Sequence, residues 1–433
     1  MNYSQSIAYL RNIQEKGAKL ALGNIKKIIC QLPFKLADMK FIQVAGTNGK
    51  GSTSHFITSI LQSASYRVGL FTSPHLQNIR ERITINKKWI SEADFARSLT
   101  TIRDISQSLL NRKKVDNMPT FFEHLFLVAL FHFHQQQVDF AVFEVGLGGR
   151  LDATSTIMPE ISVITNISLD HTKTLGKRIS DIAFEKAGII KKNIPVISGC
   201  SPYSISRKVI KDVARKRQAP FHDVINSRDN IRIRENKRGY SCRYDTEANQ
   251  YGFNVYLNGK HQAMNAATAI RTIEILNQNN RLNISKSTIY KGIRNNFVPG
   301  RIEIIDTSPG IILDGGHNVE SIRALNAFLR QKNFRDLTLV FGVLRDKNYQ
   351  KMITLLKPFI KRVVITQPIS RRALPADRLV RFFKTFEILV KPDLRDALNS
   401  AKSFKTNILV TGSLYLVGEM RNLIFQGVEH GYQ

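Results

Sequence analysis

Short apolar segments alternate with helical patterns along the first two thirds of the chain. Apolar runs that predict strands occupy Phe41–Ala45, Val68–Thr72, Phe140–Val145, Ile161–Ile167 and Val196–Ser198. Helical spacing of apolar residues predicts helices over Gly51–Ser63, Phe121–Gln136 and Ile179–Ile190. Continuous apolar strands that alternate with helices are typical of a parallel sheet covered on both faces. The pattern therefore predicts an α/β fold.

A second series of alternating elements begins after Phe297-Val298-Pro299-Gly300. Before this break, residues 81–89 alternate at period two and predict a hairpin, and helices are expected at about His261–Leu276 and Ser285–Asn295. After it, strands are expected at Ile302–Ile305, Ile311–Leu313, Leu337–Phe341, Val363–Thr366 and Ile408–Thr411. Helices are expected between them at Val319–Gln331, Asn348–Phe359, Leu394–Ser403 and Leu414–Ile424. We expect a P-loop ATPase-like parallel-sheet domain over residues 1–298 and a smaller Rossmann-like domain over 299–433.

The composition agrees with a two-domain globular protein. The chain has 433 residues, of which 42% are hydrophobic and 23% are charged. The most apolar run, Phe121–Phe133, is too short to span a bilayer and contains Glu123, His124 and His132. The N-terminus lacks a signal-peptide pattern, and three widely spaced cysteines argue against a disulfide framework. We expect a cytoplasmic protein without a membrane partner.

The net charge of +30 is unusually high. Residues 207–238 alone carry eleven Lys and Arg, but no regular aromatic residues lie between them and no nucleic-acid-binding module is recognisable. The favoured interpretation is a solvated basic surface that binds nucleic acid only nonspecifically at low salt. A nucleic-acid-stimulated ATPase is the alternative from another functional class.

Gly46-Thr47-Asn48-Gly49-Lys50-Gly51-Ser52-Thr53 is the most informative segment of the chain. It follows a predicted strand and precedes a predicted helix, which is the context of a phosphate-binding loop. Glycines let the backbone aim several N–H groups at one anion, and the helix N-terminus adds a partial positive charge. The spacing differs from the usual search pattern, so an ordinary glycine turn is the alternative.

A carboxylate, Glu144, ends the strand Phe140–Val145 and is followed by a glycine-rich segment. Ligands of open α/β sheets bind at the carboxyl ends of strands, so Glu144 is expected beside the glycine loop as a possible Mg²⁺ ligand. The alternative is a surface ion pair between Glu144 and Arg150. Asp170 and His171 similarly follow a strand end, and His171 is a candidate metal ligand supported by Asp170.

These segments, in order, resemble the dihydrofolate synthase/folylpolyglutamate synthase family of the Mur ligase superfamily. The resemblance covers nearly the whole chain. It rests on motifs at residues 44–52, 72–76, 120–123, 144–153, 170–171, 185–189, 259–267, 299–303, 314–318 and 412–419.

The resemblance implies an ATP site and a metal site. It places ATP phosphates on Gly49, Lys50, Gly51 and Ser52, and the rest of the nucleotide near Asn265, Arg301 and Asp314. It implies two Mg²⁺ ions with Ser73, Glu144, His171 and a carbamylated Lys186 as ligands. Carbamylation makes chemical sense because an ammonium group cannot bind a cation, whereas a carbamate is an anion with two oxygens. The alternative for Lys186 is a plain ion pair with Glu185.

The resemblance also implies two organic substrates. The pterin is expected near residues of two segments, namely Thr120, Phe121, Phe122, Glu123, Leu151, Asp152 and Ala153. Incoming L-glutamate is expected at Asp314, His317, Ser413 and Tyr415, with His317 as a weak candidate for the base. Two alternatives stay open: Thr120-x-x-Glu123 is also a helix capping box, and Ser413 fits the N-cap of the last helix.

The chain departs from the family pattern at four positions. Ser155 stands where Asn is frequent, Gly316 and Val319 replace Ala and Pro, and Asn348 stands where Asp is frequent. None of these changes removes an expected ligand, but they leave the substrate preference open.

The implied activity is ATP-dependent formation of an amide between L-glutamate and dihydropteroate, reduced folates, or both. The enzyme is expected to be a monomer that acts on small molecules, with the catalytic residues Lys50, Lys186, His171, Glu144 and His317. A Mur-type ligase with a different acceptor is the nearest alternative.

Overall fold

The glycine-rich loop follows the central strand of an eight-stranded sheet. The computed structural model describes residues 1–15, 22–226, 230–279 and 281–425. The sheet order is β4-β3-β2-β5-β1-β6-β7-β8. Strand β1 (Lys40–Ala45) lies parallel between β5 (Phe140–Glu144) and β6 (Ile161–Ile164). The other strands are β2 (Val68–Phe71), β3 (Ile83–Ile85), β4 (Lys88–Trp89), β7 (Val196–Ser198) and β8 (Phe221–Asp223).

Side chains of the central strands alternate between two cores. In β1, Ile42 and Val44 face one hydrophobic cluster and Phe41 faces the other. Because successive residues of a strand point to opposite faces, a continuous apolar run supplies both cores at once. The sequence-based prediction of a sheet covered on both faces is therefore confirmed.

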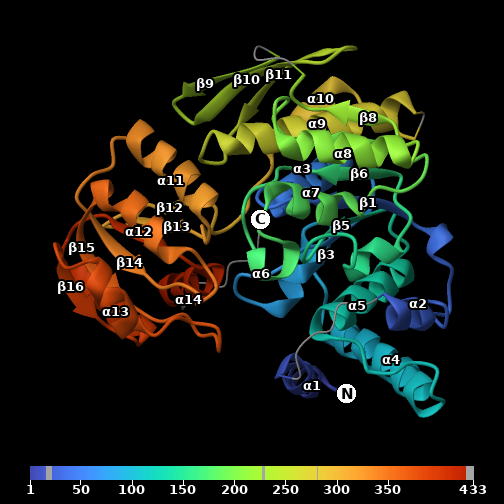
Figure 1. Cartoon of the computed structure of the whole chain (residues 1–433), viewed down its shortest axis with the longest axis horizontal. Coiled ribbons are helices and arrows are strands. Elements are labelled where there is room, and N and C mark those ends of the chain that lie inside the picture. The colour runs from blue at the N-terminus through green and yellow to red at the C-terminus, as the bar shows by residue number, and fades with distance from the viewer. Residues whose placement is uncertain (16–21, 227–229, 280, 426–433) are drawn as a thin grey trace.

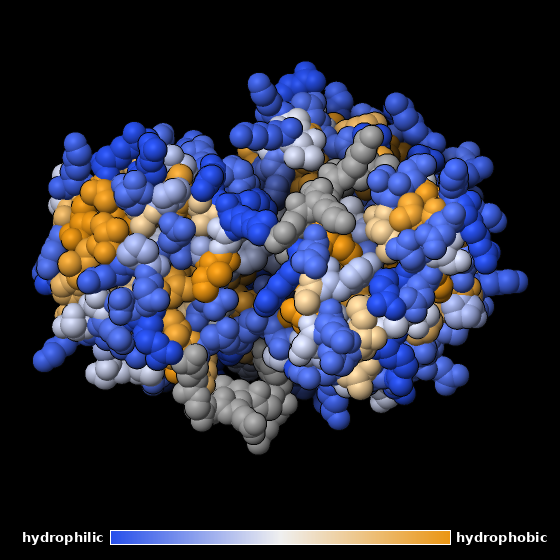
Figure 2. Space-filling model, turned by 90° about the horizontal axis from the view of Figure 1, so that it is seen from below, coloured by the Kyte–Doolittle hydropathy of each residue, from blue (hydrophilic) through white to orange (hydrophobic). Residues whose placement is uncertain are grey.

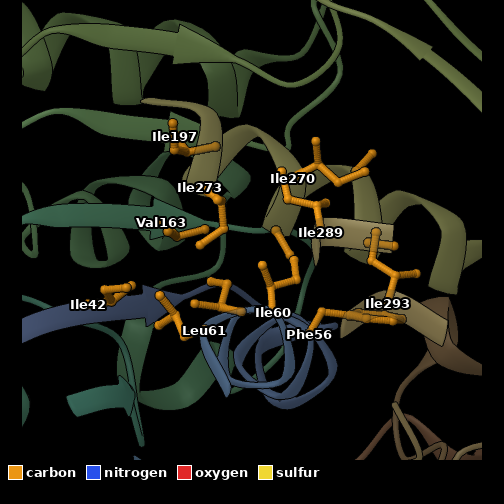
Figure 3. Close-up of a cluster of buried hydrophobic side chains, with 14 of the residues drawn as sticks. Ile42, Phe56, Ile60, Leu61, Val163, Ile197, Ile270, Ile273, Ile289 and Ile293 are labelled. Atoms are coloured by element: carbon orange, nitrogen blue, oxygen red, sulfur yellow. The ribbon is translucent and has the colours of Figure 1, made fainter. Parts of the chain in front are cut away.

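Helices cover each face of this sheet. One face packs against α3 (Lys50–Ser63), α9 (His261–Gln278) and α10 (Lys286–Arg294), and Figure 3 shows side chains of β1, these helices and neighbouring strands in this cluster. The opposite face packs against α1 (Tyr3–Glu15), α2 (Gly23–Ile29), α4 (Glu92–Asn111) and α5 (Phe121–Gln135). The remaining helices of this lobe are η1 (Leu36–Asp38), η2 (Ile79–Arg82), η3 (Ala153–Thr156), α6 (Thr172–Leu175), α7 (Ile179–Ala187) and α8 (Ile205–Lys216).

A separate antiparallel sheet covers α9 and α10, as Figure 1 shows at the top of the molecule. It consists of β9 (Ile231–Asn236), β10 (Gly239–Asp245) and β11 (Gln250–Val255). The sequence analysis assigned the start of this region to a solvated basic stretch. In β9 the arginines alternate with partly buried Ile231 and Ile233, so this basic segment is one face of an amphipathic strand.

The C-terminal lobe, orange to red in Figure 1, is built on a second, mostly parallel sheet. Its strand order is β12 (Glu303–Ile305), β13 (Ile311–Asp314), β17 (Ile408–Thr411), β14 (Leu337–Phe341), β15 (Ile360–Ile365) and β16 (Glu387–Val390). One face packs against α11 (Val319–Gln331) and α12 (Tyr349–Leu356), and the other against α13 (Leu394–Ser403) and α14 (Leu414–Phe425). Two short helices, η4 (Lys357–Phe359) and η5 (Ala376–Phe382), complete the lobe.

The two-lobed α/β architecture agrees with the predicted fold class. The domain limits at residues 298 and 299 stay a prediction. Among the described residues, no helix combines the length and the apolar character needed to cross a bilayer.

The loop after β2 packs against α14 of the C-terminal lobe and so forms a contact between the two lobes. The side chain of Gln77 donates to Asn422 Oδ1 at 2.6 Å and accepts from Arg421 Nη1 at 2.8 Å. Leu76 packs against the core of the C-terminal lobe, and its carbonyl group leaves no space for a side chain at Gly418. Figure 2 shows the two lobes side by side under a largely hydrophilic surface.

We predict that Gly292→Ala destabilises the larger lobe. Helix α10 crosses α3 at Gly292, where a Cβ atom would lie only 2.7 Å from the backbone nitrogen of Ile60. We expect a cost of about 1–3 kcal/mol, because the backbone of α3 has to shift. Thermal unfolding followed by circular dichroism measures the effect. Gly252→Ala is the matched control: no atom lies within 4 Å of its Cβ position, so its midpoint should stay the same or rise slightly. Equal midpoints for the two variants would refute the packing argument.

Candidate active site

The glycine loop lies at the point where the strand order of the large sheet reverses. Strand β1 has β5 on one side and β6 on the other, so the loop between β1 and α3 opens at the carboxyl ends of three strands. Gly46 and Gly49 adopt φ values of 147° and 80°, which glycine tolerates best. A Cβ atom at Gly46 would overlap Thr165, and one at Gly49 would overlap the amide of Asn265.

Residues after β6 fix the backbone of this loop. Thr47 N donates to the carbonyl of Asn166 at 2.7 Å, and Asn48 N donates to Asn166 Oδ1 at 2.9 Å. Thr165 Oγ1 donates to the carbonyl of Asn48 at 2.7 Å. The loop is therefore preformed rather than a free glycine turn. Asn166 was not singled out from the sequence, because it fell inside the strand predicted at Ile161–Ile167, whereas β6 ends at Ile164.

Glu144 is buried beside the loop. Its carboxylate accepts a hydrogen bond from the backbone N–H of Ser73 at 3.1 Å, and the side chain is 5% exposed. The alternative pairing with Arg150 is wrong, because Arg150 forms an ion pair with Glu185 at 2.9 Å. The sequence correctly indicated a carboxylate beside the glycine loop.

Lys186 reaches the same loop from α7. Its ammonium group donates to the carbonyl of Gly46 at 2.7 Å, and the residue is 5% exposed. Burial, together with the nearby charge of Lys50, lowers the pKa of Lys186 to about 7. A large fraction of Lys186 is therefore an uncharged amine at neutral pH. The alternative ion pair with Glu185 is wrong, since Glu185 is engaged by Arg150.

Lys50 lies at the electrostatic centre of the site. Its ammonium group donates to the carbonyl of Thr47 at 3.2 Å. Burial lowers the pKa of Lys50 and raises that of Glu144, so each charge weakly offsets the desolvation of the other. The other charges that act on Lys50 belong to Asp152, Asp170 and Arg301. In turn, Lys50 acts electrostatically on His171 and Lys186.

The expected metal ligands are only partly assembled. Within the described ranges, no group of three or more His, Cys, Asp or Glu side chains is positioned to hold a metal. Ser73 and Glu144 are neighbours, whereas His171 is exposed at the start of α6 with a φ of 50°. The oxygens of Glu144 suit a hard cation such as Mg²⁺, and a carbamate on Lys186 would add two more. The donor chemistry thus fits Mg²⁺ once Lys186 is carbamylated.

The first expected pterin segment begins α5. Thr120 N donates to Glu123 Oε2 at 2.7 Å and Glu123 N donates to Thr120 Oγ1 at 3.3 Å, which confirms the capping box. Phe121 lies under the guanidinium group of Arg82, at 5.3 Å from the ring centre. The ring of Phe122 packs against Gly146, where a Cβ atom would lie 2.6 Å from it. Phe122 therefore packs this helix against the loop after Glu144, whereas Phe121 contacts Arg82 at the end of η2.

Asp152, in the second expected pterin segment, organises its own loop. Its carboxylate accepts hydrogen bonds from Leu147 N at 2.9 Å and from Thr154 N at 3.0 Å. The flanking residues Leu151 and Ala153 are thereby held in place. Ser155, one of the family departures, donates from its hydroxyl to the carbonyl of Gly149 and closes the same loop.

In the C-terminal lobe, Asp314 and its neighbours line the junction with the large lobe. The carboxylate of Asp314 accepts from Ile302 N at 3.1 Å and from Gly316 N at 2.9 Å. A Cβ atom at Gly316 would lie 2.6 Å from Asp314 Oδ1, so an alanine here would require the Asp314 side chain to shift. Arg301 acts electrostatically on Asp314 and has no hydrogen bond or ion pair to another residue within the described parts of the chain.

The three remaining residues of the expected glutamate site also lie at this junction. His317 Nδ1 lies 3.0 Å from the carbonyl of Gly315, and burial lowers the pKa of His317 to about 4. Tyr415 N donates to Ser413 Oγ at 3.2 Å, which confirms Ser413 as a cap of α14. The Tyr415 side chain acts electrostatically on Arg82 of the other lobe.

A polar clasp of Asn48, Asp170, Asn318 and Lys347 joins the lobes beside the loop. Asn318 Nδ2 donates to Asn48 Oδ1 at 2.9 Å and to Asp170 Oδ2 at 3.1 Å. Lys347 donates to Asp170 Oδ1 at 2.7 Å. Burial alone would raise the pKa of Asp170, but Lys347 and His317 hold it well below its usual range. A cavity of about 700 Å³ adjoins the clasp. The sequence did not indicate Lys347, because nothing in it shows that residues 170 and 347 meet.

Comparisons with known proteins identify the family. Residues 44–273 match the Mur ligase middle domain, and residues 300–414 match the Mur ligase glutamate ligase domain. The dihydrofolate synthase/folylpolyglutamate synthase of Bacillus subtilis is 34% identical, and the alignment covers 97% of this chain and 98% of the relative. The chain belongs to the dihydrofolate synthase/folylpolyglutamate synthase family of Mur ligases. It is therefore an ATP-dependent, amide-forming ligase.

Solved structures of similar proteins contain ligands of the expected kinds. Escherichia coli FolC in complex with DHPP and ADP has a TM-score of 0.85 and 27% identity, with 98% of each chain covered. A bifunctional folylpolyglutamate synthase/dihydrofolate synthase with Mn, AMPPNP and L-glutamate bound has a TM-score of 0.83 and 27% identity, again with 98% of each chain covered.

We predict that Lys347→Met weakens the contact between the lobes. The side chains of Lys347 and Asp170 are 5% and 9% exposed, and removing one partner of a buried pair costs about 3–5 kcal/mol. We expect a lower thermal midpoint and a larger radius of gyration in small-angle X-ray scattering. Arg323→Met is the control: Arg323 pairs with Glu320 on the surface, where both side chains are more than half exposed, so a change of about 0.5 kcal/mol or less is expected. If Lys347→Met behaves like this control, the clasp does not hold the lobes together.

Proposed function

We propose that this ligase adds L-glutamate to dihydropteroate, to folyl-glutamates, or to both. The observation that carries the proposal is the convergence on Lys50 of a preformed glycine loop, the buried Glu144 and the amine of Lys186. A carboxylate is a poor electrophile because its leaving group would be oxide. These groups suit the transfer of a phosphoryl group to that carboxylate, which supplies a better leaving group.

The proposed reaction has two steps. A carboxylate oxygen of the pterin substrate attacks the γ-phosphorus of ATP, and ADP leaves. The amine of L-glutamate then attacks the acyl carbon, an amide bond forms, phosphate departs and the amine loses a proton. The protein positions the reactants and neutralises their charges. In this proposal Gly49, Lys50, Gly51 and Ser52 hold the phosphates, while the remainder of the nucleotide lies near Asn265, Arg301 and Asp314.

The metal-binding role is assigned to Ser73, Glu144, His171 and carbamylated Lys186, for two Mg²⁺ ions. Bound Mg²⁺ would neutralise phosphate charge and favour attack at phosphorus. Formation of the carbamate requires an uncharged amine that attacks CO₂ and releases a proton. A lysine with a pKa of about 7 meets that requirement at neutral pH, whereas an exposed lysine does not.

The substrate-binding roles are divided between the lobes. The pterin is assigned to Thr120–Glu123 and Leu151–Ala153, and L-glutamate to Asp314, His317, Ser413 and Tyr415. The ring of His317 is uncharged at neutral pH and able to accept the proton of the amine, although its low pKa makes it a weak base. Closure of the lobes through the clasp would exclude water that hydrolyses an acyl phosphate.

We further infer a monomeric, cytoplasmic enzyme without a specific nucleic-acid partner. Cys30, Cys200 and Cys242 are unpaired, which suits a reducing compartment. Arg232 and Arg234 of β9 are exposed, whereas Ile231 and Ile233 on the other face of the strand pack on the protein. This arrangement agrees with a solvated basic surface.

Incorporation of labelled L-glutamate tests the proposal directly. Purified protein, ATP and Mg²⁺ are incubated in parallel with dihydropteroate and with tetrahydrofolate, and the products are separated by chromatography. We expect an amide product with at least one acceptor, formed with one ADP per glutamate. Folded protein that hydrolyses ATP in response to RNA or DNA, and makes no product from either pterin, would contradict the assignment.

We predict that Lys186→Ala strongly reduces turnover because the variant lacks the carbamate. Short carboxylic acids such as acetate should restore part of the activity by filling the vacated volume with an anion. The same acids should leave the wild type unchanged, and the thermal midpoint of the variant should stay close to that of the wild type. Full activity of Lys186→Ala without added acid would rule out the carbamate role.

A further inference from the structure

Arg82 is a buried arginine at the junction of the lobes that has no role in the proposed function so far. It ends the short helix η2, and its backbone carbonyl accepts a hydrogen bond from Thr72 N at 3.0 Å. The residue is 6% exposed. The backbone of Arg82 is thus attached to the residue that follows β2.

Within the described residues, no carboxylate forms an ion pair or a hydrogen bond with this guanidinium group, although Glu81 and Glu144 act on it electrostatically. Its one hydrogen bond runs from Nε to Nδ1 of His75 at 2.9 Å. Since arginine has no acceptor, that ring nitrogen is unprotonated, and His75 supplies a lone pair rather than a negative charge. The adjacent carboxylate of Glu81 is directed elsewhere, because it accepts three backbone N–H bonds from Leu76, Gln77 and Asn78.

The two Nη atoms are therefore available to a ligand. Neither makes a hydrogen bond to the described protein, and neither is among the polar atoms sealed from solvent. A buried charge without a partner is costly, and proteins usually pair it. The two Nη atoms of an arginine match the two oxygens of a carboxylate in a bidentate arrangement. A carboxylate is therefore the ligand group that suits Arg82.

Arg82 lies near residues of both expected substrate segments. The guanidinium group lies over the ring of Phe121, in the expected pterin segment. Tyr415, in the expected glutamate segment, and Glu144, beside the phosphate loop, are close enough to act electrostatically on Arg82. Arg82 is the side chain that relates both substrate segments to the reacting centre.

We propose that Arg82 binds a substrate carboxylate through its two Nη atoms and so aligns the acceptor and L-glutamate for coupling. This inference rests on the proposed function and adds a specificity residue to it. Two carboxylates share the required chemistry: that of the pterin substrate and that of L-glutamate. Loss of this interaction raises the KM for the substrate whose carboxylate Arg82 binds.

Arg82→Met is the central variant. It removes the charge and both Nη donors and keeps most of the apolar stem. We expect the KM for one of the two carboxylate substrates to rise about 10- to 100-fold, because charge-assisted bidentate hydrogen bonds are lost. ATP affinity should be unchanged. The thermal midpoint should be equal or higher, since an unpaired buried charge is removed. The KM of Arg82→Lys for that substrate should lie between the values of Arg82→Met and the wild type.

Arg80→Met is the matched control. Arg80 lies in the same short helix but points toward Tyr3 and Trp89 and pairs with Glu92 at 3.5 Å. Its kinetic constants should match those of the wild type. Varying L-glutamate at saturating pterin, and pterin at saturating L-glutamate, identifies which carboxylate Arg82 binds. Unchanged KM values for both substrates in Arg82→Met, or a lowered midpoint with only kcat reduced, would overturn the proposal.

A second measurement separates this proposal from the proposed function. Calorimetric binding of L-glutamate and of dihydropteroate to the protein loaded with a non-hydrolysable ATP analogue needs no turnover. Weaker binding of one ligand to Arg82→Met supports the role of Arg82 whether or not product forms. A wild type that makes no amide would refute the proposed function alone, whereas unaltered binding of both ligands to Arg82→Met would refute the role of Arg82.

Discussion

The structure depends on a glycine turn that is held open at the ends of three parallel strands. Gly46 and Gly49 give the turn its left-handed backbone, and Asn166 and Thr165 hold it from the neighbouring strand end. Because a strand on each side of β1 ends there, side chains from β5, β6 and α7 reach the same turn. The site is thus a consequence of sheet order, which explains why residues distant in sequence meet around Lys50.

Burial of charge is the second organising constraint. Lys50, Glu144, Lys186 and Arg82 are removed from water without complete neutralisation by the protein, and the pKa values of the first three are shifted toward their uncharged forms. Such an arrangement lowers stability in the absence of ligands, and it strengthens the attraction of the buried cations Lys50 and Arg82 for an anionic substrate. By contrast, Asp170 has its own cation in Lys347, and it serves the contact between the lobes.

Features that depend on neighbouring residues in the sequence were predicted correctly, whereas contacts that depend on how distant segments pack were missed. The glycine loop and Glu144 followed from residues beside strand ends, and the capping roles of Thr120 and Ser413 followed from local chemistry. The clasp between Asp170 and Lys347 did not, since their meeting depends on how the lobes pack. The strands β9–β11 were also missed, because outward arginines obscured the period-two alternation of Ile231 and Ile233.

A crystal structure with a non-hydrolysable ATP analogue and Mg²⁺ tests the central claim most directly. The account predicts that the β- and γ-phosphates lie within hydrogen-bond distance of the backbone N–H groups of residues 49–52 and of the ammonium group of Lys50. It also predicts a metal beside Glu144. A nucleotide bound elsewhere, with the glycine turn empty, would contradict the account.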